Sequence, residues 1–467
     1  MNLLFIVPSR GLGYPTIFKS MFYIPNLAIT TLAALTQNDY KISIIDENSR
    51  NVDLSFYSKI KADLVAITVN TPNATRAYAI ADILKKRGIT VVFGGIHASL
   101  LPDEGLMYCD AILVGEAEIL WKQLLEDFST GNLKRLYQCS EKPDLLNSIV
   151  PRNNLLPHKS LFKINSVQTT RGCPFKCDFC SVSAFYGKTF RYKPISNVIN
   201  EIVNRKSKYI FFVDDNIVGS RKYAKDLFIR LGSLAIKWVS QVPISIANDR
   251  ELLELVKKSG CAGLMVGFDS ISSDNLLSVN KRHNNVKDYV TAVKEIRSTG
   301  IPVAGSFIFG FDDDDRTIFE KTIEFSKEME IDIAFFFILT PYPGTPLYKR
   351  LRDQGRIIIT DWSKYDCNHV VFLPKKMSIS ELKEGFEWAW NVFYSPRRTI
   401  PRIFRMFKSP VIFSNLFYLF GRKFHRMELN VSKSESLQNT LTWGGVKRWA
   451  RIVSRQTKST IIIPKNT

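Results

Sequence analysis

Short hydrophobic runs alternate with amphipathic stretches along the first 135 residues. The runs consist mainly of Ile, Val, Leu, Phe and Ala and have the length of buried strands. The stretches between them predict helices at 26–35 and 74–87. Because strands that alternate with helices form a parallel sheet covered on both faces, we expect residues 1–135 to form a Rossmann-like, flavodoxin-like α/β domain. Its strands are predicted at 2–7, 41–45, 63–69, 90–93 and 111–114.

A second alternating pattern begins after residues 136–162, whose polar and proline positions indicate a linker. Between residues 163 and 355, five or six strand–helix units favour a partial (β/α)6 barrel of the TIM type over another open sheet. Its strands are predicted at 166–170, 209–214, 236–246, 262–268, 303–309 and 333–339, with helices at 249–258 and 286–298. A helical pattern at 378–394 lies in the last region, 356–467, which we expect to be a helical, basic extension.

Composition indicates a folded protein of the cytoplasm. With 467 residues, 45% hydrophobic and 23% charged, the chain has room for two or three globular domains. Its seven cysteines are odd in number and mostly scattered, which does not fit a secreted disulfide framework. Residues 1–8 lack the features of a signal peptide. The apolar stretch 410–420 is about half the length of a membrane-spanning helix, so no such helix is predicted.

The net charge of +20 is concentrated at the end of the chain. Residues 396–467 hold 15 lysines and arginines against Glu428 and Glu435, a net of +13, which leaves +7 for the rest. Aromatic residues are interspersed among these bases, which begin with Arg397, Arg398 and Arg402. Such a tail favours an anionic partner, either a membrane surface or nucleic acid. The alternative is a solvated basic helix pair packed on the barrel.

The most specific motif is TTRGCPFKCDFCSVSAFYG at 169–187, whose cysteines are separated by three and two residues. Thiolates with this spacing, at Cys173, Cys177 and Cys180, can ligate three irons of a four-iron cluster and leave the fourth without a protein ligand. An open iron can bind a further molecule and pass an electron into it, which a fully ligated cluster cannot do. The motif therefore indicates catalysis and not electron transfer alone.

Two neighbouring features bear on this cysteine motif. We expect the bases Arg171 and Lys176 to favour the thiolate forms, although plain surface charge would explain them equally well. A structural zinc site is the alternative for the cysteines. Zinc needs a fourth ligand, for which only His158 or a distant cysteine is available, so the iron–sulfur interpretation is preferred.

The cysteine spacing, with Phe179 before the third cysteine and a strand before the first, resembles the radical S-adenosylmethionine (SAM) superfamily. The resemblance implies that SAM binds the open iron and is reductively cleaved to a 5′-deoxyadenosyl radical, which abstracts hydrogen from an unactivated carbon. It extends through the predicted barrel, although residues 212–216 (FVDDN) replace the family's Gly-Gly-Glu motif. The SAM-contacting residues that the resemblance implies are Phe179, Asp214, Asp215, Ser245, Gly267, Gly305 and Gly310.

Ordinary structural roles compete for some of these residues. Asp214 and Asp215 could cap the next helix, and Gly305 and Gly310 could be packing glycines. The sequence PYPGTP at 341–346 predicts a rigid turn after the last strand, which would close the barrel near the site.

Residues 63–118 resemble the cobalamin-binding domain that precedes many radical SAM barrels. The motif that supplies an axial histidine to cobalt, Asp-x-His-x-x-Gly, is absent. We interpret His97 as an ordinary supporting residue, not as a substitute ligand. A flavodoxin-like domain without a cofactor is the alternative. The residues that the resemblance implies around the cofactor's nucleotide tail are Thr68, Asn70, Gly94, Gly95 and Gly115.

Together, the two resemblances imply a cobalamin-dependent radical SAM enzyme, with C-methylation of an unactivated carbon as the leading hypothesis. Cyclisation, oxidation or rearrangement, with cobalamin unused or non-methylating, is the alternative. Transfer-RNA methylthiolation is disfavoured, because that family has three N-terminal cysteines where this chain has only Cys109 before the linker. A nucleic-acid-binding iron–sulfur protein would explain the basic tail but leaves the barrel and the open iron without a purpose.

The expected partners follow from the tail and from the radical chemistry. The basic, aromatic tail favours a lipid or other hydrophobic small-molecule substrate and peripheral contact at the inner membrane surface. Nucleic acid is disfavoured as a partner. Reductive cleavage of SAM requires a reductant, such as flavodoxin or ferredoxin, and all of this is consistent with a cytoplasmic location.

Overall fold

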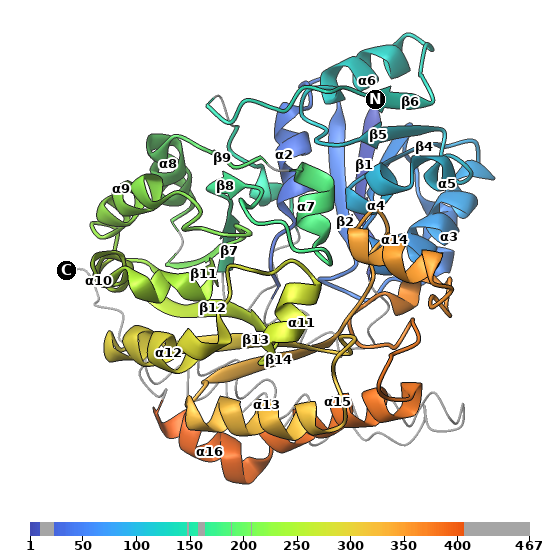
Figure 1. The fold of residues 1–467 in the computed structure, drawn as a ribbon. Helices are drawn as coiled ribbons and strands as arrows, with labels where there is room; N and C mark the ends of the chain where they lie inside the picture. Colours follow the sequence, from blue (N-terminus) through green and yellow to red (C-terminus); the bar gives the residue numbers. More distant parts are fainter. Residues whose placement is uncertain (10–22, 147–148, 157–163, 188, 207, 406–467) are drawn as a thin grey trace, which may run out of the picture. The chain divides into compact units, whose positions relative to one another are not determined.

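The computed structural model describes residues 1–9, 23–146, 149–156, 164–187, 189–206 and 208–405, all within one compact unit, Met1–Phe417. These residues form two six-stranded parallel sheets and one short antiparallel ribbon (Figure 1). The apolar stretch 410–420 and most of the basic tail lie outside the described residues. The predicted α/β architecture, an open sheet followed by a partial barrel, is confirmed.

The first sheet has the flavodoxin-like strand order β2-β1-β3-β4-β5-β6. Five of its strands are at the predicted positions. The sixth, β6, lies in the stretch that we interpreted as linker. It has only three residues and one buried side chain, too few for a periodic pattern. The strands are β1 (Asn2–Val7), β2 (Lys41–Asp46), β3 (Leu64–Thr68), β4 (Thr90–Gly94), β5 (Ala111–Val114) and β6 (Leu136–Gln138).

Helices cover both faces of this sheet. Because successive strand residues point to opposite faces, Ile6 and Ile67 pack on the side of α3, whereas Phe5 and Ala66 pack on the side of α2 and α6. Side chains buried on both faces explain why the strands are continuous hydrophobic runs. The helices of this domain are α2 (Leu27–Leu35), α3 (Ala74–Lys85), α4 (Ile96–Leu100), α5 (Pro102–Gly105) and α6 (Trp121–Ser129).

The second sheet forms the partial barrel, with strand order β14-β13-β12-β11-β10-β7. The predicted strand 236–246 was too long: Pro243, which has no N–H to donate to a neighbouring strand, ends it, and Ile244–Asn248 form a 3₁₀ helix. The strands are β7 (Ile164–Val167), β10 (Tyr209–Phe212), β11 (Lys237–Val242), β12 (Cys261–Asp269), β13 (Val303–Phe309) and β14 (Ile333–Ile338).

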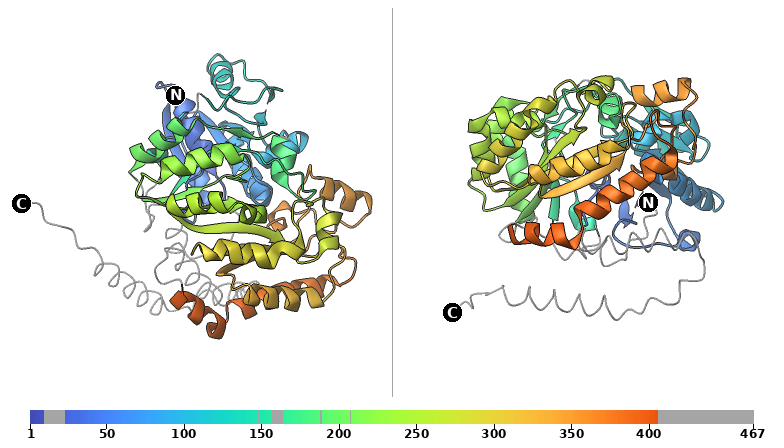
Figure 2. Two further views of the ribbon diagram at one scale, coloured as in Figure 1. Left: turned by 60° about the vertical axis from the view of Figure 1, so that its left-hand side comes forward. Right: turned by 60° about the horizontal axis from the view of Figure 1, so that its bottom comes forward.

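Amphipathic helices line the outer side of the barrel strands, and α13 and α15 lie side by side (Figures 1 and 2). Their starts follow local capping chemistry: Asp249 accepts a hydrogen bond at the start of α10, and Ser378 with Glu381 forms a capping box at the start of α15. The outer helices are α8 (Ile195–Arg205), α9 (Arg221–Leu231), α10 (Arg250–Lys258), α12 (Tyr289–Ser298), α13 (Thr317–Glu328) and α15 (Ile379–Phe393).

The last described helix, α16 (Pro396–Arg405), contains the first bases of the basic tail. Arg402, one of the bases expected to favour an anionic partner, is instead buried, with its guanidinium 3.8 Å from the centre of the Phe393 ring and donating to the Phe393 carbonyl. Ile400 and Phe404 are exposed instead, Phe404 to 74%. No helix among the described residues has both the length and the apolar character needed to cross a bilayer.

The chain returns from the barrel to the first domain through a strap, residues 341–366. The predicted PYPGTP turn leads into α14 (Pro346–Asp353), and its Gly344 packs against Leu100 of α4. Further along, Trp362 lies edge-on to the buried His97 ring and donates a 2.7 Å hydrogen bond to Glu104. The strap therefore ties the end of the barrel to the first sheet.

Replacing Trp362 with alanine should lower the free energy of unfolding by about 2 kcal/mol, below the usual range for a core tryptophan because the ring is only half-buried. Urea unfolding of the apoprotein measures this change. Trp388→Ala is the matched control: its side chain is 41% exposed on α15, so we expect a change within about 0.5 kcal/mol. Equal effects of both substitutions would contradict a stabilising role for the strap.

Candidate functional site

The cysteine loop, residues 172–187, begins at a short antiparallel ribbon of β8 (Thr170–Arg171) and β9 (Arg191–Tyr192). Gly172 starts the loop with φ +86°, and a Cβ atom there would collide with the Thr189 carbonyl oxygen, so only glycine permits this turn. The third cysteine precedes α7 (Ser181–Tyr186) directly. All three cysteines are half-buried and lie near enough to influence one another's ionisation.

Burial raises the pKa of all three thiols, to about 12 for Cys177, and the nearby Lys281 ammonium offsets part of that rise. Burial therefore outweighs any stabilisation of the thiolates that Arg171 and Lys176 provide. The Arg171 guanidinium is instead paired with two carboxylates of the first domain, and Lys176 is exposed. Metal binding itself can remove the protons, because a coordinated thiol is deprotonated.

The donor set fits a cluster with an open iron: three thiols on one loop, with no fourth cysteine on that loop. Among the described residues, no group of three or more His, Cys, Asp or Glu side chains is placed to hold a metal ion. A four-iron cluster is larger than one ion and takes its thiol ligands further apart. His158, the other zinc candidate, lies outside the described residues.

Asp214 and Asp215 follow β10 and have different surroundings. Asp214 is fully buried and accepts hydrogen bonds from the backbone N–H and hydroxyl groups of both Thr169 and Thr170, at 2.8 Å from the Thr169 hydroxyl. It therefore fixes the residues that lead into the cysteine loop and does not cap the next helix, α9. Asp215 accepts from the Gly172 N–H, and burial together with the Asp214 carboxylate raises its pKa to about 6.

Sequence reasoning missed a buried ion pair beside the cysteines, between Lys281 and Asp269. Asp269 ends β12 with φ +60° and also accepts a 3.1 Å hydrogen bond from Ser306. A Cβ atom on Gly267 would lie 3.2 Å from the Lys281 Nζ, so the glycine leaves room for the lysine. The available signal was a charged residue at the carboxyl end of a strand, a position where parallel sheets place their sites.

The other residues implied for SAM are spread over the barrel. Phe179 packs edge-on to Phe311, with ring centres 6.4 Å apart, and Ser245 is exposed just beyond β11. A Cβ atom on Gly305 would lie within 3.2 Å of the Phe268 ring, and one on Gly310 would lie 2.8 Å from Leu382. Packing therefore accounts for both glycines, as the competing interpretation held.

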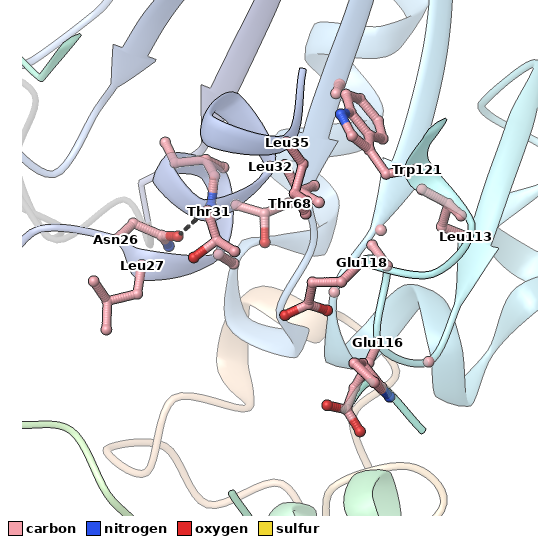
Figure 3. Close-up of a pocket in the computed structure, with 18 of the residues that line it drawn as sticks. Asn26, Leu27, Thr31, Leu32, Leu35, Thr68, Leu113, Glu116, Glu118 and Trp121 are labelled. Atoms are coloured by element: carbon pink, nitrogen blue, oxygen red, sulfur yellow. Dashed lines mark hydrogen bonds between the residues drawn. The ribbon is translucent and has the colours of Figure 1, made fainter. Parts of the chain in front are cut away.

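A cavity of about 480 Å³ opens at the carboxyl edge of the first sheet (Figure 3). All five residues implied for cobalamin line it, and Thr68 lies beside α2 in the close-up. Gly95, with φ +100°, brings its backbone so close to Val69 that a Cβ atom would lie 2.8 Å from the Val69 carbonyl oxygen. Gly94 and Gly115 have no such obstruction.

Residues of both domains form the walls of this cavity. Leu27, Leu32 and Trp121 provide apolar surface from the first domain. From the barrel side, Arg171 precedes the cysteine loop, and α7 contributes Tyr186. The cavity thus reaches from the glycines of the first sheet to the loop that carries the cysteines, which fits a large cofactor held between the two domains.

His97 has the supporting role that we assigned to it. It is fully buried in α4, and its ring nitrogens lie 3.2 Å from the Thr71 hydroxyl and 3.1 Å from the Tyr78 hydroxyl. It is not among the residues that line the cavity. With both nitrogens engaged, it is not available as an axial ligand.

Family models match three stretches of the chain. Residues 15–125 match the B12 binding domain, and residues 167–326 match the radical SAM superfamily. The third match, at 345–453, is to a domain of unknown function (DUF4070), and its part beyond residue 405 lies outside the described residues. The first two matches contain the cavity glycines and the cysteine loop.

Similar proteins share most of the chain. Bacteriochlorophyllide d C-12(1)-methyltransferase of Chlorobaculum tepidum is 33% identical over 77% of this chain and 80% of its own length. Hopanoid C-2 methylase of Rhodopseudomonas palustris is 26% identical over 81% of this chain and 73% of its own length. In fold, the chain resembles the radical SAM methyltransferase TsrM of Kitasatospora setae, with a TM-score of 0.62, 18% identity and 76% of each chain covered.

Asp314 supplies a prediction about pH. It is buried, accepts hydrogen bonds from the Gly310 and Phe311 N–H groups, and has its pKa raised by burial to about 6. Because the folded protein holds this proton more tightly than the unfolded chain, the free energy of unfolding should fall as pH rises from about 4 to about 6. Asp314→Asn should remove up to about 3 kcal/mol of that fall.

Urea unfolding between pH 4 and 7 tests this. Asp274→Asn, at an exposed position on α11 (Ser273–Ser278), should leave the pH dependence unchanged. A slope that is the same with Asp or Asn at position 314 would contradict the prediction.

Proposed function

This chain belongs to the cobalamin-dependent radical SAM methyltransferase family, and from that premise we propose that it transfers a methyl group to an unactivated carbon of a hydrophobic small molecule or lipid. It is a radical SAM enzyme whose cofactors are a [4Fe–4S] cluster, SAM and cobalamin. When bound, the cluster and SAM supply a 5′-deoxyadenosyl radical, and cobalamin carries the methyl group. The protein has to hold these groups around one substrate carbon and exclude water.

The observation that carries the proposal is the shared cavity. It is lined by the five residues implied for cobalamin and also by Arg171, next to the cysteine loop. A cofactor in this cavity would therefore border both domains. We propose that Thr68, Asn70, Gly94, Gly95 and Gly115 bind cobalamin.

On the barrel side, Cys173, Cys177 and Cys180 would hold the cluster. Of the two aspartates, Asp215 is the better candidate for contact with SAM, because its carboxylate is close enough to Cys173 and Cys180 to raise the pKa of their thiols. Asp214 would act through the loop that it fixes. Phe179, Ser245, Gly267, Gly305 and Gly310 remain proposed contacts of SAM.

Three observations support a hydrophobic substrate. The cavity walls are largely apolar, and the matched relatives include enzymes named for a bacteriochlorophyllide and a hopanoid. The exposed Ile400 and Phe404 of α16 stand beside the bases Arg397 and Arg398, an arrangement suited to an anionic membrane surface. We propose a cytoplasmic enzyme with peripheral membrane contact, reduced by flavodoxin or ferredoxin.

Anaerobic purification and reconstitution test this function. Iron and cobalt analysis should find both metals, and incubation with SAM, reductant and candidate hydrophobic substrates should give 5′-deoxyadenosine, S-adenosylhomocysteine and a methylated product. Deoxyadenosine and a ring-closed or oxidised product without S-adenosylhomocysteine would favour the alternative chemistry. Bound zinc without iron would overturn the proposal.

Cys177→Ala should abolish iron incorporation and lower 5′-deoxyadenosine formation by at least about 1,000-fold, because two thiolates cannot hold the cluster in place. Iron analysis and the visible absorption spectrum measure this loss. Neither should change in the control, Cys139→Ala, whose half-buried thiol lies outside the cysteine loop. Normal iron content in the Cys177 variant would contradict the assignment.

Gly94→Phe should weaken cobalamin binding by about tenfold or more, because the ring would project into the cavity. Gly94 is preferable to Gly95 for this test, since a Cβ atom at Gly94 meets only Leu113 at 3.9 Å and leaves the backbone unstrained. Cobalt content after reconstitution measures the loss, while some deoxyadenosine formation should persist. Gly232→Phe, at an exposed position after α9, controls for added bulk. Unchanged cobalt content in Gly94→Phe would argue against this pocket.

A further inference from the structure

Two arginines flank the cysteine loop and face each other across its base. Arg171 ends β8 and Arg191 begins β9, and the two are directly opposite in the antiparallel ribbon. Like charges in such a pair repel each other and destabilise the ribbon. The ribbon has only two residues on each strand, so it cannot offset this repulsion with further pairing. An anion between the arginines offsets this repulsion at the base of the loop.

Glu116 of the first domain is that anion. One carboxylate oxygen lies 2.6 Å from the Arg171 Nη1, and the other is paired with the Arg191 guanidinium. The Glu116 side chain is 3% exposed and the Arg171 side chain 12%, so water screens these pairs weakly. Burial lowers the pKa of Arg171, but Glu118 and Glu116 raise it by more, and the guanidinium stays charged.

The same carboxylate stands at the edge of the cavity. Glu116 directly follows Gly115, one of the glycines proposed to bind cobalamin, and both Glu116 and Glu118 line the cavity (Figure 3). Glu118 pairs with the second amino group of Arg171. Arg191 donates a 2.9 Å hydrogen bond to the carbonyl oxygen of Pro143, which lies between the two domains in sequence and also lines the cavity. The ion-pair network thus joins the cobalamin pocket, the base of the cysteine loop and the segment between the domains.

We infer that Glu116 is a positioning residue, which holds both ends of the cysteine loop against the cobalamin pocket and so sets how the two cofactors face each other. Its carboxylate is occupied by two arginines, so its role is to place other groups and not to touch the reacting atoms. The inference rests on the proposed function, because it takes the cavity to be the cobalamin site.

Hydrogen–deuterium exchange of the apoprotein tests the positioning without any cofactor. In Glu116→Gln, the amides of residues 172–187 should exchange about tenfold faster or more, because the two arginines are left without their shared counter-ion. Adding Arg191→Gln to this variant should restore part of the protection, since the repulsion disappears with one of the charges. Unchanged exchange in Glu116→Gln would overturn the inference.

The matched control is Glu251→Gln. Glu251 also pairs with two cations, Arg221 and Lys225, but it lies on the exposed surface of the barrel, with its side chain 60% exposed. In the Glu251→Gln variant, we expect the amides of residues 172–187 to exchange as fast as they do in the unmodified protein. Faster exchange in this control as well would show a general loss of stability and would also overturn the assignment to Glu116.

Electron paramagnetic resonance of the reconstituted enzyme measures the relation between the cofactors. With the cluster reduced and cobalamin present as cob(II)alamin, nearby unpaired electrons broaden or split each other's signals. Glu116→Gln should keep its iron and cobalt but lose or change this interaction, whereas Glu251→Gln should retain it. If the unmodified enzyme binds no cobalt, the proposed function fails, while the exchange experiment still decides whether Glu116 holds the loop.

Discussion

Parallel strands bring the loops that follow them to one edge of the sheet, and the placement of most candidate functional residues depends on this constraint. In the first sheet, Gly94 ends β4, and Gly95 and Gly115 directly follow β4 and β5. In the barrel, Asp214 follows β10 and Asp269 ends β12. In each domain, residues far apart in sequence therefore meet at one edge of the sheet.

Buried charge then decides how the loops at these edges are held. Asp214 is removed from water and compensated by four donors from two threonines, and Asp269 is compensated by Lys281 and Ser306. A buried charge without partners costs several kcal/mol, so each pairing locks the geometry of its loop. The cysteine loop is thus fixed from the barrel side by Asp214 and from the first domain by Glu116. These contacts hold the loop that carries the three thiols in place.

Packing between the domains completes the cavity. The strap places Trp362 against His97, and Ser166 of β7 donates a 2.9 Å hydrogen bond to the Pro25 carbonyl oxygen of the first domain. The residues of these contacts are far apart along the chain, yet both contacts join the first domain to the barrel or its strap. A cavity lined by both domains keeps its shape only while such contacts hold them together, which links stability to the arrangement of the cofactors.

The sequence by itself determined most of the strands, the longer amphipathic helices such as α3 and α15, and the cysteine motif, because periodicity and cysteine spacing are local properties. The cavity glycines were implied by the resemblance to a cobalamin-binding domain. The sequence predicted β5 and β13 with their observed bounds. Short elements such as β6 escaped it, since three residues show no period. Only the tertiary structure decided that Arg171 pairs with Glu116, that Lys281 lies near Cys177, and that Arg402 is buried. The charge of a side chain can be read locally, but its partner and its exposure to water depend on segments that meet only after folding.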